Sequence, residues 1–198
     1  CFSVLGVARE LAVINNLKLH LPEIPKVHDS FKDSIKIKVC PEGPSYFGRT
    51  LKNISIDAKT QPLIAERLKL SDQKLIDPVV DITNYILLEL GQPLHAFDRD
   101  TLNGNIYVRT AKHNEPITLL DEQQIELDSN CLVISDDKGA VAFAGIMGGK
   151  ETAVSNSTKS IFLESAYFKP SSIRGKARRY GFQTDASLRF ERGVDFEI

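Results

Sequence analysis

The sequence NIYVRTAKHNEPITLLDEQQIELDSNCLVISDDKGAVAFAGIMGG, residues 105–149, is a succession of short β-like runs at close spacing. Apolar and β-branched residues fill the runs, and polar turn residues separate them. The DDKG sequence at 136–139 predicts a hairpin between two of them. SIFLESAYF at 160–168 adds one more strand-like run. We therefore expect consecutive strands here, without alternating helices.

Helical and strand patterns precede this region. Residues 3–19 place apolar side chains on one helical face, and Pro22 and Pro25 then end the helix and begin a linker. SIKIKV at 34–39 alternates strictly between apolar and polar residues, which predicts a strand. YFGRTLKNISID at 46–57 continues in the same style after the turn-forming PEGP sequence.

Two more helices are predicted before the strands begin. TQPLIAERLKL at 60–70 carries Pro62 where a first helical turn tolerates it. DPVVDITNYILLELG at 77–91 predicts a helix that ends at the capping residue Gly91. Its apolar face is expected to consist of Val79, Ile82, Ile86 and Leu90.

Helices followed by a run of strands indicate an α+β fold with two packed sheets, rather than a doubly wound α/β fold. KPSSIRGKARRYGF at 169–182 returns to a helical pattern, with Gly181 as its stop. The start CFSVLGVARE has neither a Met nor a signal-peptide pattern, so we expect a piece of a longer protein. Residues 34–198 are expected to form one domain, and residues 1–33 a helix and linker from the preceding part of the chain.

The composition is that of a globular protein, with 42% hydrophobic and 26% charged residues and a net charge of −1. This balance argues against a generally basic nucleic-acid-binding protein. Residues 174–192 nevertheless contain six basic and two acidic residues, which favours a local anionic partner or a solvated basic helix face. No apolar run approaches the roughly 18 residues of a membrane span. Three widely spaced cysteines, Cys1, Cys40 and Cys131, suggest no disulfide framework or metal site, and a cytoplasmic location fits best.

Three features are candidates for chemistry. AGIMGG at 144–149 lacks the residues of a nucleotide loop, so it is either a tight turn or a place where a ligand meets bare backbone. Glu164 shares a strand face with Phe162 and Ala166, so it is either partly buried or on an edge strand in solvent or paired to an Arg. His95 follows a helix end, as a base, a donor or a structural plug. No Ser-His-Asp order and no metal-ligand spacing is present.

Four long segments together resemble the β-chain family of bacterial phenylalanyl-tRNA synthetases. They are DPVVDITNYILLELGQPLHAFD, AGIMGG, LESAYF and RRYGFQTDASLRFERGVD, in the family's order and spacing. The resemblance covers essentially the whole chain and points to the editing module, a three-layer α+β unit with an unusual β-sandwich and flanking helices. It implies hydrolysis of tyrosine wrongly esterified to tRNA(Phe).

The resemblance also implies the site. His95 matches the family's pocket histidine, and Glu164 matches the glutamate that recognises the tyrosine hydroxyl. The expected pocket wall and substrate-side lining are Ala144, Gly145, Gly148, Thr184 and Ala186. Lys74 stands where the family has an Arg, so the charge is kept but the bidentate fork is lost.

Partners and cofactors follow from the same resemblance. The acceptor end of tRNA(Phe) is the expected nucleic-acid partner, and the synthetase α chain, in an α2β2 enzyme, is the expected protein partner. Editing needs no cofactor, whereas ATP and Mg²⁺ serve aminoacylation outside this chain. The expected tRNA contacts are Arg174, Lys176, Arg178 and Arg179. The alternative is a tRNA-docking or subunit-contact module without catalysis.

Overall fold

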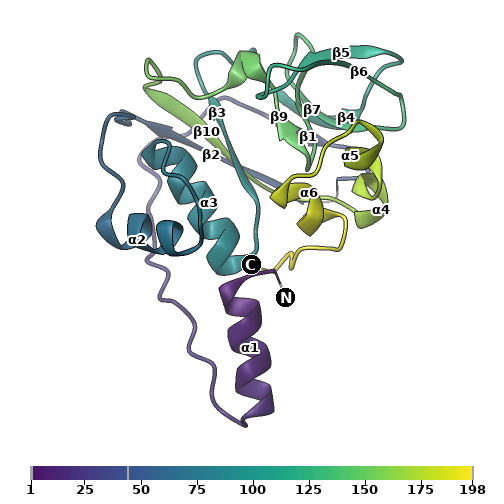
Figure 1. Cartoon of the computed structure of the whole chain (residues 1–198). Coiled ribbons are helices and arrows are strands. Elements are labelled where there is room, and N and C mark those ends of the chain that lie inside the picture. The colour runs from purple at the N-terminus through teal and green to yellow at the C-terminus, as the bar shows by residue number, and fades with distance from the viewer. Residues whose placement is uncertain (1, 44, 198) are drawn as a thin grey trace.

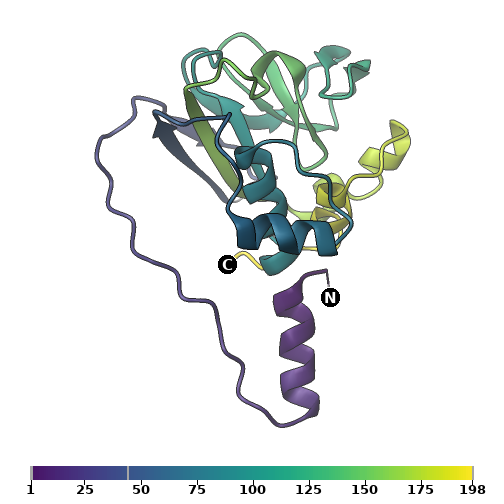
Figure 2. The same cartoon turned by 60° about the vertical axis from the view of Figure 1, so that its left-hand side comes forward.

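The computed structural model describes residues 2–43 and 45–197. Cys1, and Pro44 of the expected PEGP turn, lie outside the described residues. Helices, a three-stranded sheet and a five-stranded sheet form successive layers (Figures 1 and 2). The helices α2 (Pro62–Leu70) and α3 (Pro78–Leu90) cover one face of the three-stranded sheet. The predicted α+β class is confirmed.

The three-stranded sheet has the order β2 (Ser45–Lys52), β10 (Ser160–Tyr167) and β3 (Leu94–Asp98), and all its pairs are antiparallel. Its middle strand, β10, comes last in the sequence, so the sheet is assembled from three distant segments. The strand β3 was not predicted, because the sequence pattern indicated only that His95 follows the end of a helix. His95 does follow the end of α3, and it lies within β3.

The five-stranded sheet has the order β1 (Ile37–Val39), β4 (Ile106–Thr110), β7 (Leu132–Ser135), β8 (Ala140–Phe143) and β9 (Met147–Gly148). The pair β1–β4 is parallel, and the other pairs are antiparallel. The strands β5 (Glu115–Thr118) and β6 (Gln124–Leu127) form a separate hairpin, and the 3₁₀-helix η1 (Lys150–Thr152) follows β9. The strands expected between residues 105 and 149 are confirmed, as is the DDKG turn, where Asp136 N–H donates to the Gly139 carbonyl.

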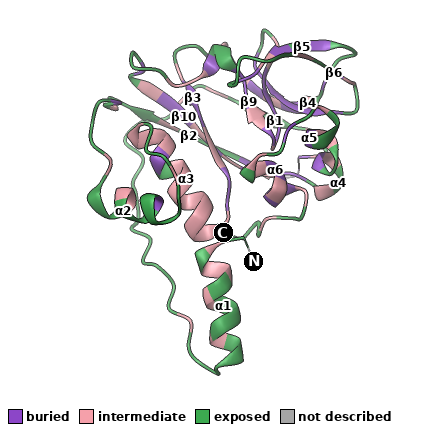
Figure 3. Ribbon diagram, in the orientation of Figure 1, coloured by how far each residue is buried: buried purple, intermediate pink, exposed green. Residues whose placement is uncertain are grey.

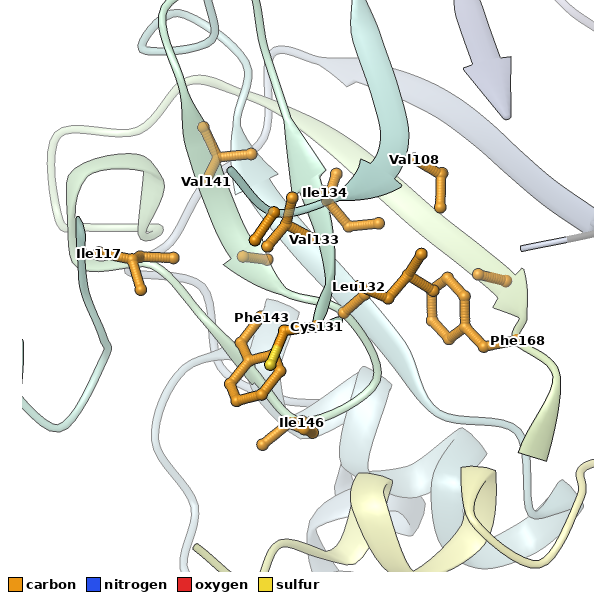
Figure 4. Packing of buried hydrophobic residues seen from close by; sticks show 14 of the residues in the cluster. Val108, Ile117, Cys131, Leu132, Val133, Ile134, Val141, Phe143, Ile146 and Phe168 are labelled. Atoms are coloured by element: carbon orange, nitrogen blue, oxygen red, sulfur yellow. The ribbon is translucent and has the colours of Figure 1, made fainter. Parts of the chain in front are cut away.

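The core lies between the two sheets. Because side chains alternate along a strand, Tyr46 on β2, Phe97 on β3 and Phe162 on β10 all face the five-stranded sheet. They belong to one cluster with Val108, Leu132 and their neighbours. Figure 4 shows the part of this cluster around Val108 and Leu132. Figure 3 shows the buried residues concentrated in these strands, while α1 (Val4–Ile14) is mostly exposed.

The helix α3 is defined by its ends. Asp77 caps the N-terminus by accepting bonds from Val79 N–H and Val80 N–H, and Gly91 ends it with a φ of 83°. The predicted apolar face is partly wrong. Ile82 is 46% exposed, whereas Asp81 is buried and accepts bonds from Thr60 and the Ile76 N–H. These two bonds make burial of the carboxylate tolerable.

The C-terminal segment differs from the single predicted helix. It forms α4 (Pro170–Ile173) and α5 (Lys176–Arg179), separated by Arg174 in an extended conformation and Gly175 at a φ of 74°. A left-handed glycine interrupts the helical hydrogen bonds, so one continuous basic helix is wrong. A further helix, α6 (Asp185–Phe190), was not predicted.

The predicted N-terminal helix is confirmed as α1, but it ends at Ile14, well before Pro22 and Pro25, and Asn16 adopts a φ of 52° just after it. The linker starts at the far end of α1 and runs in extended form back to the body, where it leads into β1 (Figure 2). Asp33 fastens its end, because both the Nε and an Nη of Arg99 donate to this carboxylate. The pairing with Arg99 holds the pKa of Asp33 well below its usual range.

Packing between the sheets predicts the effect of one core deletion. Phe97 is fully buried, so Phe97→Ala should lower the free energy of unfolding by about 3–5 kcal/mol. Phe47 on β2 is 68% exposed, and Phe47→Ala should change it by less than about 0.5 kcal/mol. Urea denaturation of both variants measures the difference, and equal losses would contradict the assigned faces of the sheet.

Candidate functional site

Three residues form a row across the three-stranded sheet. Glu164 on β10 lies opposite Gly48 on β2 and opposite His95 on β3. Directly opposed residues of antiparallel strands present their side chains on the same face. Glu164 and His95 therefore both point into the space between the sheets, although 69 positions separate them in the sequence.

Glu164 is a buried carboxyl, only 7% exposed, on the central strand of its sheet. The edge-strand alternative is therefore wrong. The Tyr46 hydroxyl donates to Glu164 Oε2 over 2.8 Å. Burial raises the pKa of Glu164 to about 7, against the opposing effect of the Tyr46 hydrogen bond.

His95 has an unsatisfied nitrogen. Its Nε2 is shielded from solvent and has no hydrogen-bond partner among the described residues. The ring packs edge-on against Phe97, with centroids 4.4 Å apart. Burial lowers the pKa of His95 to about 4, so the imidazole is neutral at neutral pH. A buried polar atom without a partner is costly and needs an explanation, such as a ligand that completes it.

Gly148, on β9 of the five-stranded sheet, lies against His95 of the three-stranded sheet. A Cβ at position 148 would lie 2.3 Å from His95 Cε1, 2.6 Å from Nε2 and 3.2 Å from Leu120 Cδ1. The imidazole thus lies directly over the glycine. The resemblance places Gly148 in the lining of a substrate pocket, and in this structure the His95 ring lies against it.

The AGIMGG segment is largely occupied by its own hydrogen bonds. The N–H groups of Ala144, Ile146 and Gly149 donate to the carbonyls of Leu132, Phe143 and Val141, respectively. A ligand-binding role for these three N–H groups is therefore wrong. Gly145 adopts a φ of 69°, as a tight turn requires, and a Cβ there would meet side chains of α4 and α6. Ala144 is buried in the core.

Thr184 and Ala186 belong to α6, which is attached to the same segment. Thr184 caps α6 by accepting the Ser187 N–H, and its hydroxyl donates to the Ile146 carbonyl over 2.9 Å. Ala186 lies in the first turn of α6 and packs, half-buried, against the core. The start of α6 is thus bonded to Ile146, which lies two positions before Gly148 in the sequence.

The remaining predicted residues are not brought to this site. Lys74 is exposed in the segment between α2 and α3, the helices that cover one face of the three-stranded sheet (Figure 1), whereas His95 is on the other face. Arg179 forms an ion pair with Asp128 at 2.5 Å, and Arg174 donates to the Glu191 carbonyl. For Lys176 and Arg178 no ion pair is found within residues 2–43 and 45–197.

The family follows from comparison with known proteins. The model of the B3/4 domain matches residues 42–198. This chain belongs to the B3/4 domain family. Its B3/4 domain includes both sheets except β1, and therefore contains Tyr46, His95 and Glu164.

Whole proteins of known name also match. The chain is 53% identical over 200 residues to the phenylalanine--tRNA ligase β subunit of Idiomarina loihiensis and 48% identical over 199 residues to that of Acinetobacter baylyi. Each match covers 100% of this chain but 25% of the relative, so the chain spans about a quarter of these proteins.

A solved structure shares the fold. It is an N-terminal fragment of the phenylalanyl-tRNA synthetase β subunit from Pyrococcus horikoshii, with a TM-score of 0.55 and 17% identity. The match covers 83% of this chain and 51% of the fragment. At this identity the likeness shows the fold alone.

Tyr46 is the site residue that sequence reasoning missed. The alternation in SYFGRTLK places it on one strand face with Gly48, which the sequence shows. The register of β2 against β10 brings it to Glu164, and that pairing spans 118 positions. No local pattern reports such a long-range contact.

Other parts of the B3/4 domain offer less. A cavity of about 1000 Å³ lies beside the β5–β6 hairpin, and neither His95 nor Glu164 lines it.

Within the described ranges, no group of three or more His, Cys, Asp or Glu side chains is placed to hold a metal ion. No helix in the part of the chain that the structure describes has the length and apolar character to cross a membrane.

The two buried groups predict opposing effects of pH on stability. Glu164 has a raised pKa, so it stabilises the fold at low pH and this contribution is lost as pH rises from about 4.5 to about 7. His95 has a lowered pKa, so its contribution is lost as pH falls from about 6.5 to about 4. In the unmodified chain the two trends largely offset each other.

Glu164→Gln should separate these trends. From pH 4.5 to pH 7 the unmodified chain should lose about 3 kcal/mol of unfolding free energy relative to Glu164→Gln, because the variant has no carboxyl to ionise at this position. Denaturant titrations at several pH values measure it. A difference independent of pH would show that Glu164 ionises at its ordinary pKa and is not desolvated.

Proposed function

We propose that this chain is the post-transfer editing module of a phenylalanyl-tRNA synthetase β subunit, and that it hydrolyses the ester of mischarged Tyr-tRNA(Phe). The observation that carries the proposal is the buried pair of Glu164 and His95, which meet on one face of the sheet. Residues 34–198 form the editing unit, and residues 1–33 connect it to the rest of the subunit.

Glu164 supplies the selectivity. Phenylalanine and tyrosine differ by one hydroxyl, and an apolar pocket rejects an added hydroxyl by only about a hundredfold. A desolvated acceptor instead selects for the added hydroxyl, because tyrosine satisfies the acceptor and phenylalanine leaves it unpaired. Sites built on such hydrogen bonds discriminate by about 10⁴ to 10⁵. The correct product, Phe-tRNA(Phe), is thereby spared.

His95 positions the reacting groups. A pKa of about 4 makes its imidazole a weak base at neutral pH, so it orients the ester or the attacking water through its unpaired Nε2. An aminoacyl ester is already activated, and placement of water and polarisation of the carbonyl suffice without a covalent nucleophile. The free terminal ribose hydroxyl of the tRNA is the candidate proton relay: it accepts the proton of the attacking water while its own proton passes to the ester oxygen that leaves.

The partners are those of the parent enzyme. The acceptor end of tRNA(Phe) approaches the site, and Arg174, Lys176 and Arg178 on the α4–α5 segment contact its phosphates. Lys74 lies behind the three-stranded sheet, so any tRNA phosphate that it contacts is outside the pocket. The α chain completes a cytoplasmic α2β2 ligase, whose ATP and Mg²⁺ serve aminoacylation outside this chain.

Release of tyrosine tests the function directly. The complete α/β enzyme should free tyrosine from Tyr-tRNA(Phe) and leave Phe-tRNA(Phe) intact, because only tyrosine satisfies the buried acceptor. Acid precipitation of radiolabelled aminoacyl-tRNA measures both rates. Equal hydrolysis of the two esters, or none of either, would reject editing and favour the docking module.

Removal of the acceptor should abolish the preference. Glu164→Ala in the complete enzyme should reduce the ratio of tyrosyl to phenylalanyl ester hydrolysis by at least about a hundredfold, since the tyrosine hydroxyl loses its partner. Glu126→Ala, at an exposed position of β6, is the matched control and should keep the ratio. An unchanged ratio in Glu164→Ala would refute the role of Glu164.

A bulky side chain on α6 should block the pocket. Ala186→Trp should reduce tyrosine release at least about tenfold without changing aminoacylation, because the first turn of α6 lies beside the Gly148 segment. Ala58→Trp, at an exposed position, is the matched control. If Ala186→Trp edits normally, Ala186 does not line the site.

A further inference from the structure

We infer that Tyr46 is a positioning residue for tyrosine selectivity: it holds one oxygen of Glu164 and thereby presents the other oxygen to the substrate hydroxyl. This inference rests on the proposed editing function and adds to it a residue and a mechanism of recognition. Tyr46 does not contact the reacting ester, because it acts through Glu164.

The sheet register places Tyr46 for this role. Tyr46 lies opposite Ala166, and Gly48 lies opposite Glu164, so Tyr46 is the diagonal neighbour of the carboxyl on the same face. A side chain at Gly48 would meet the Phe162 ring, whose Cζ lies 2.0 Å from the Cβ position. Because Gly48, directly opposite Glu164 on β2, has no side chain, the Tyr46 phenol reaches the carboxyl diagonally.

The hydrogen bond divides the two oxygens of Glu164. Oε2 accepts from the Tyr46 hydroxyl at 2.8 Å, which is the one hydrogen bond found on this carboxyl among the described residues, so Oε1 is left for another donor. A carboxylate that is held at one oxygen loses most of its rotational freedom. The free oxygen then has a fixed position for a second donor, and preorganised acceptors discriminate better than mobile ones. The bond already present joins a phenol to a carboxylate, the same chemistry that a tyrosine substrate would add.

The bond also favours the acceptor form of Glu164. A donated hydrogen bond stabilises the ionised carboxylate, whereas burial destabilises it. The described titratable groups that face Glu164 are Tyr46 on β2 and His95 on β3. Burial raises the pKa of the Tyr46 phenol well above its ordinary value, so the hydroxyl keeps its proton and remains a donor. His95 is neutral at neutral pH, so it adds no charge beside Glu164.

Tyr46→Phe tests the inference with a single hydroxyl removed. In the complete enzyme, KM for Tyr-tRNA(Phe) should rise by about tenfold, the scale of one hydrogen bond, while kcat changes little because His95 and the ester are untouched. The tyrosine preference should also set in at a higher pH than in the unmodified enzyme, since Glu164 then ionises later.

Tyr180→Phe is the matched control. Tyr180 accepts the Asp128 N–H at 2.9 Å and lies away from Glu164, so its loss weakens the fold without touching the carboxyl. This variant should keep KM and the pH dependence of the preference.

The outcomes separate the two proposals. If the unmodified enzyme discriminates and Tyr46→Phe retains its KM and pH dependence, the role of Tyr46 is overturned and editing stands. If both Tyr→Phe variants change KM and kcat alike, Tyr46 is merely structural and the inference is overturned. If the unmodified enzyme hydrolyses neither ester, or both equally, the editing function fails and the inference fails with it.

Discussion

A carboxyl placed on an apolar strand face is the constraint on which the site depends. Alternation along β10 puts Glu164 on the same side as Phe162 and Ala166, which belong to the core between the two sheets. Packing these apolar neighbours therefore removes Glu164 from water. The chain retains this group in a costly position because the Tyr46 hydroxyl offsets part of the desolvation.

Two glycines leave room for ring side chains around this carboxyl. Gly48 leaves space on β2 for the Phe162 ring, and Gly148 leaves space on β9 for the His95 ring. Any larger residue would collide with an aromatic ring at one of these points. The imidazole is consequently pressed against bare backbone, with its Nε2 cut off from solvent. Close packing, rather than an ion pair, creates the neutral histidine and the weakly acidic carboxyl.

The sequence predicts the elements better than their partners. Local periodicity and turn residues located most helices and strands, and the family resemblance located His95 and Glu164. Local patterns failed where long-range packing decides: β3 was not predicted as a strand, and Asp81 rather than Ile82 proved to be buried. The basic helix was interrupted at Gly175, whose left-handed conformation the pattern did not reveal. Tyr46 was missed because only the sheet register brings it to Glu164.

The pKa of the Glu164 carboxyl is the most direct measure of this account, because it reports both desolvation and recognition of a phenol. Carbon-13 NMR of the labelled carboxyl should give a value near 7 in the free chain. Bound tyrosine should lower that value, since its hydroxyl donates to the ionised form, and bound phenylalanine should not. A free-chain pKa near the ordinary 4.5, unchanged by either amino acid, would contradict a buried carboxyl that reads the tyrosine hydroxyl.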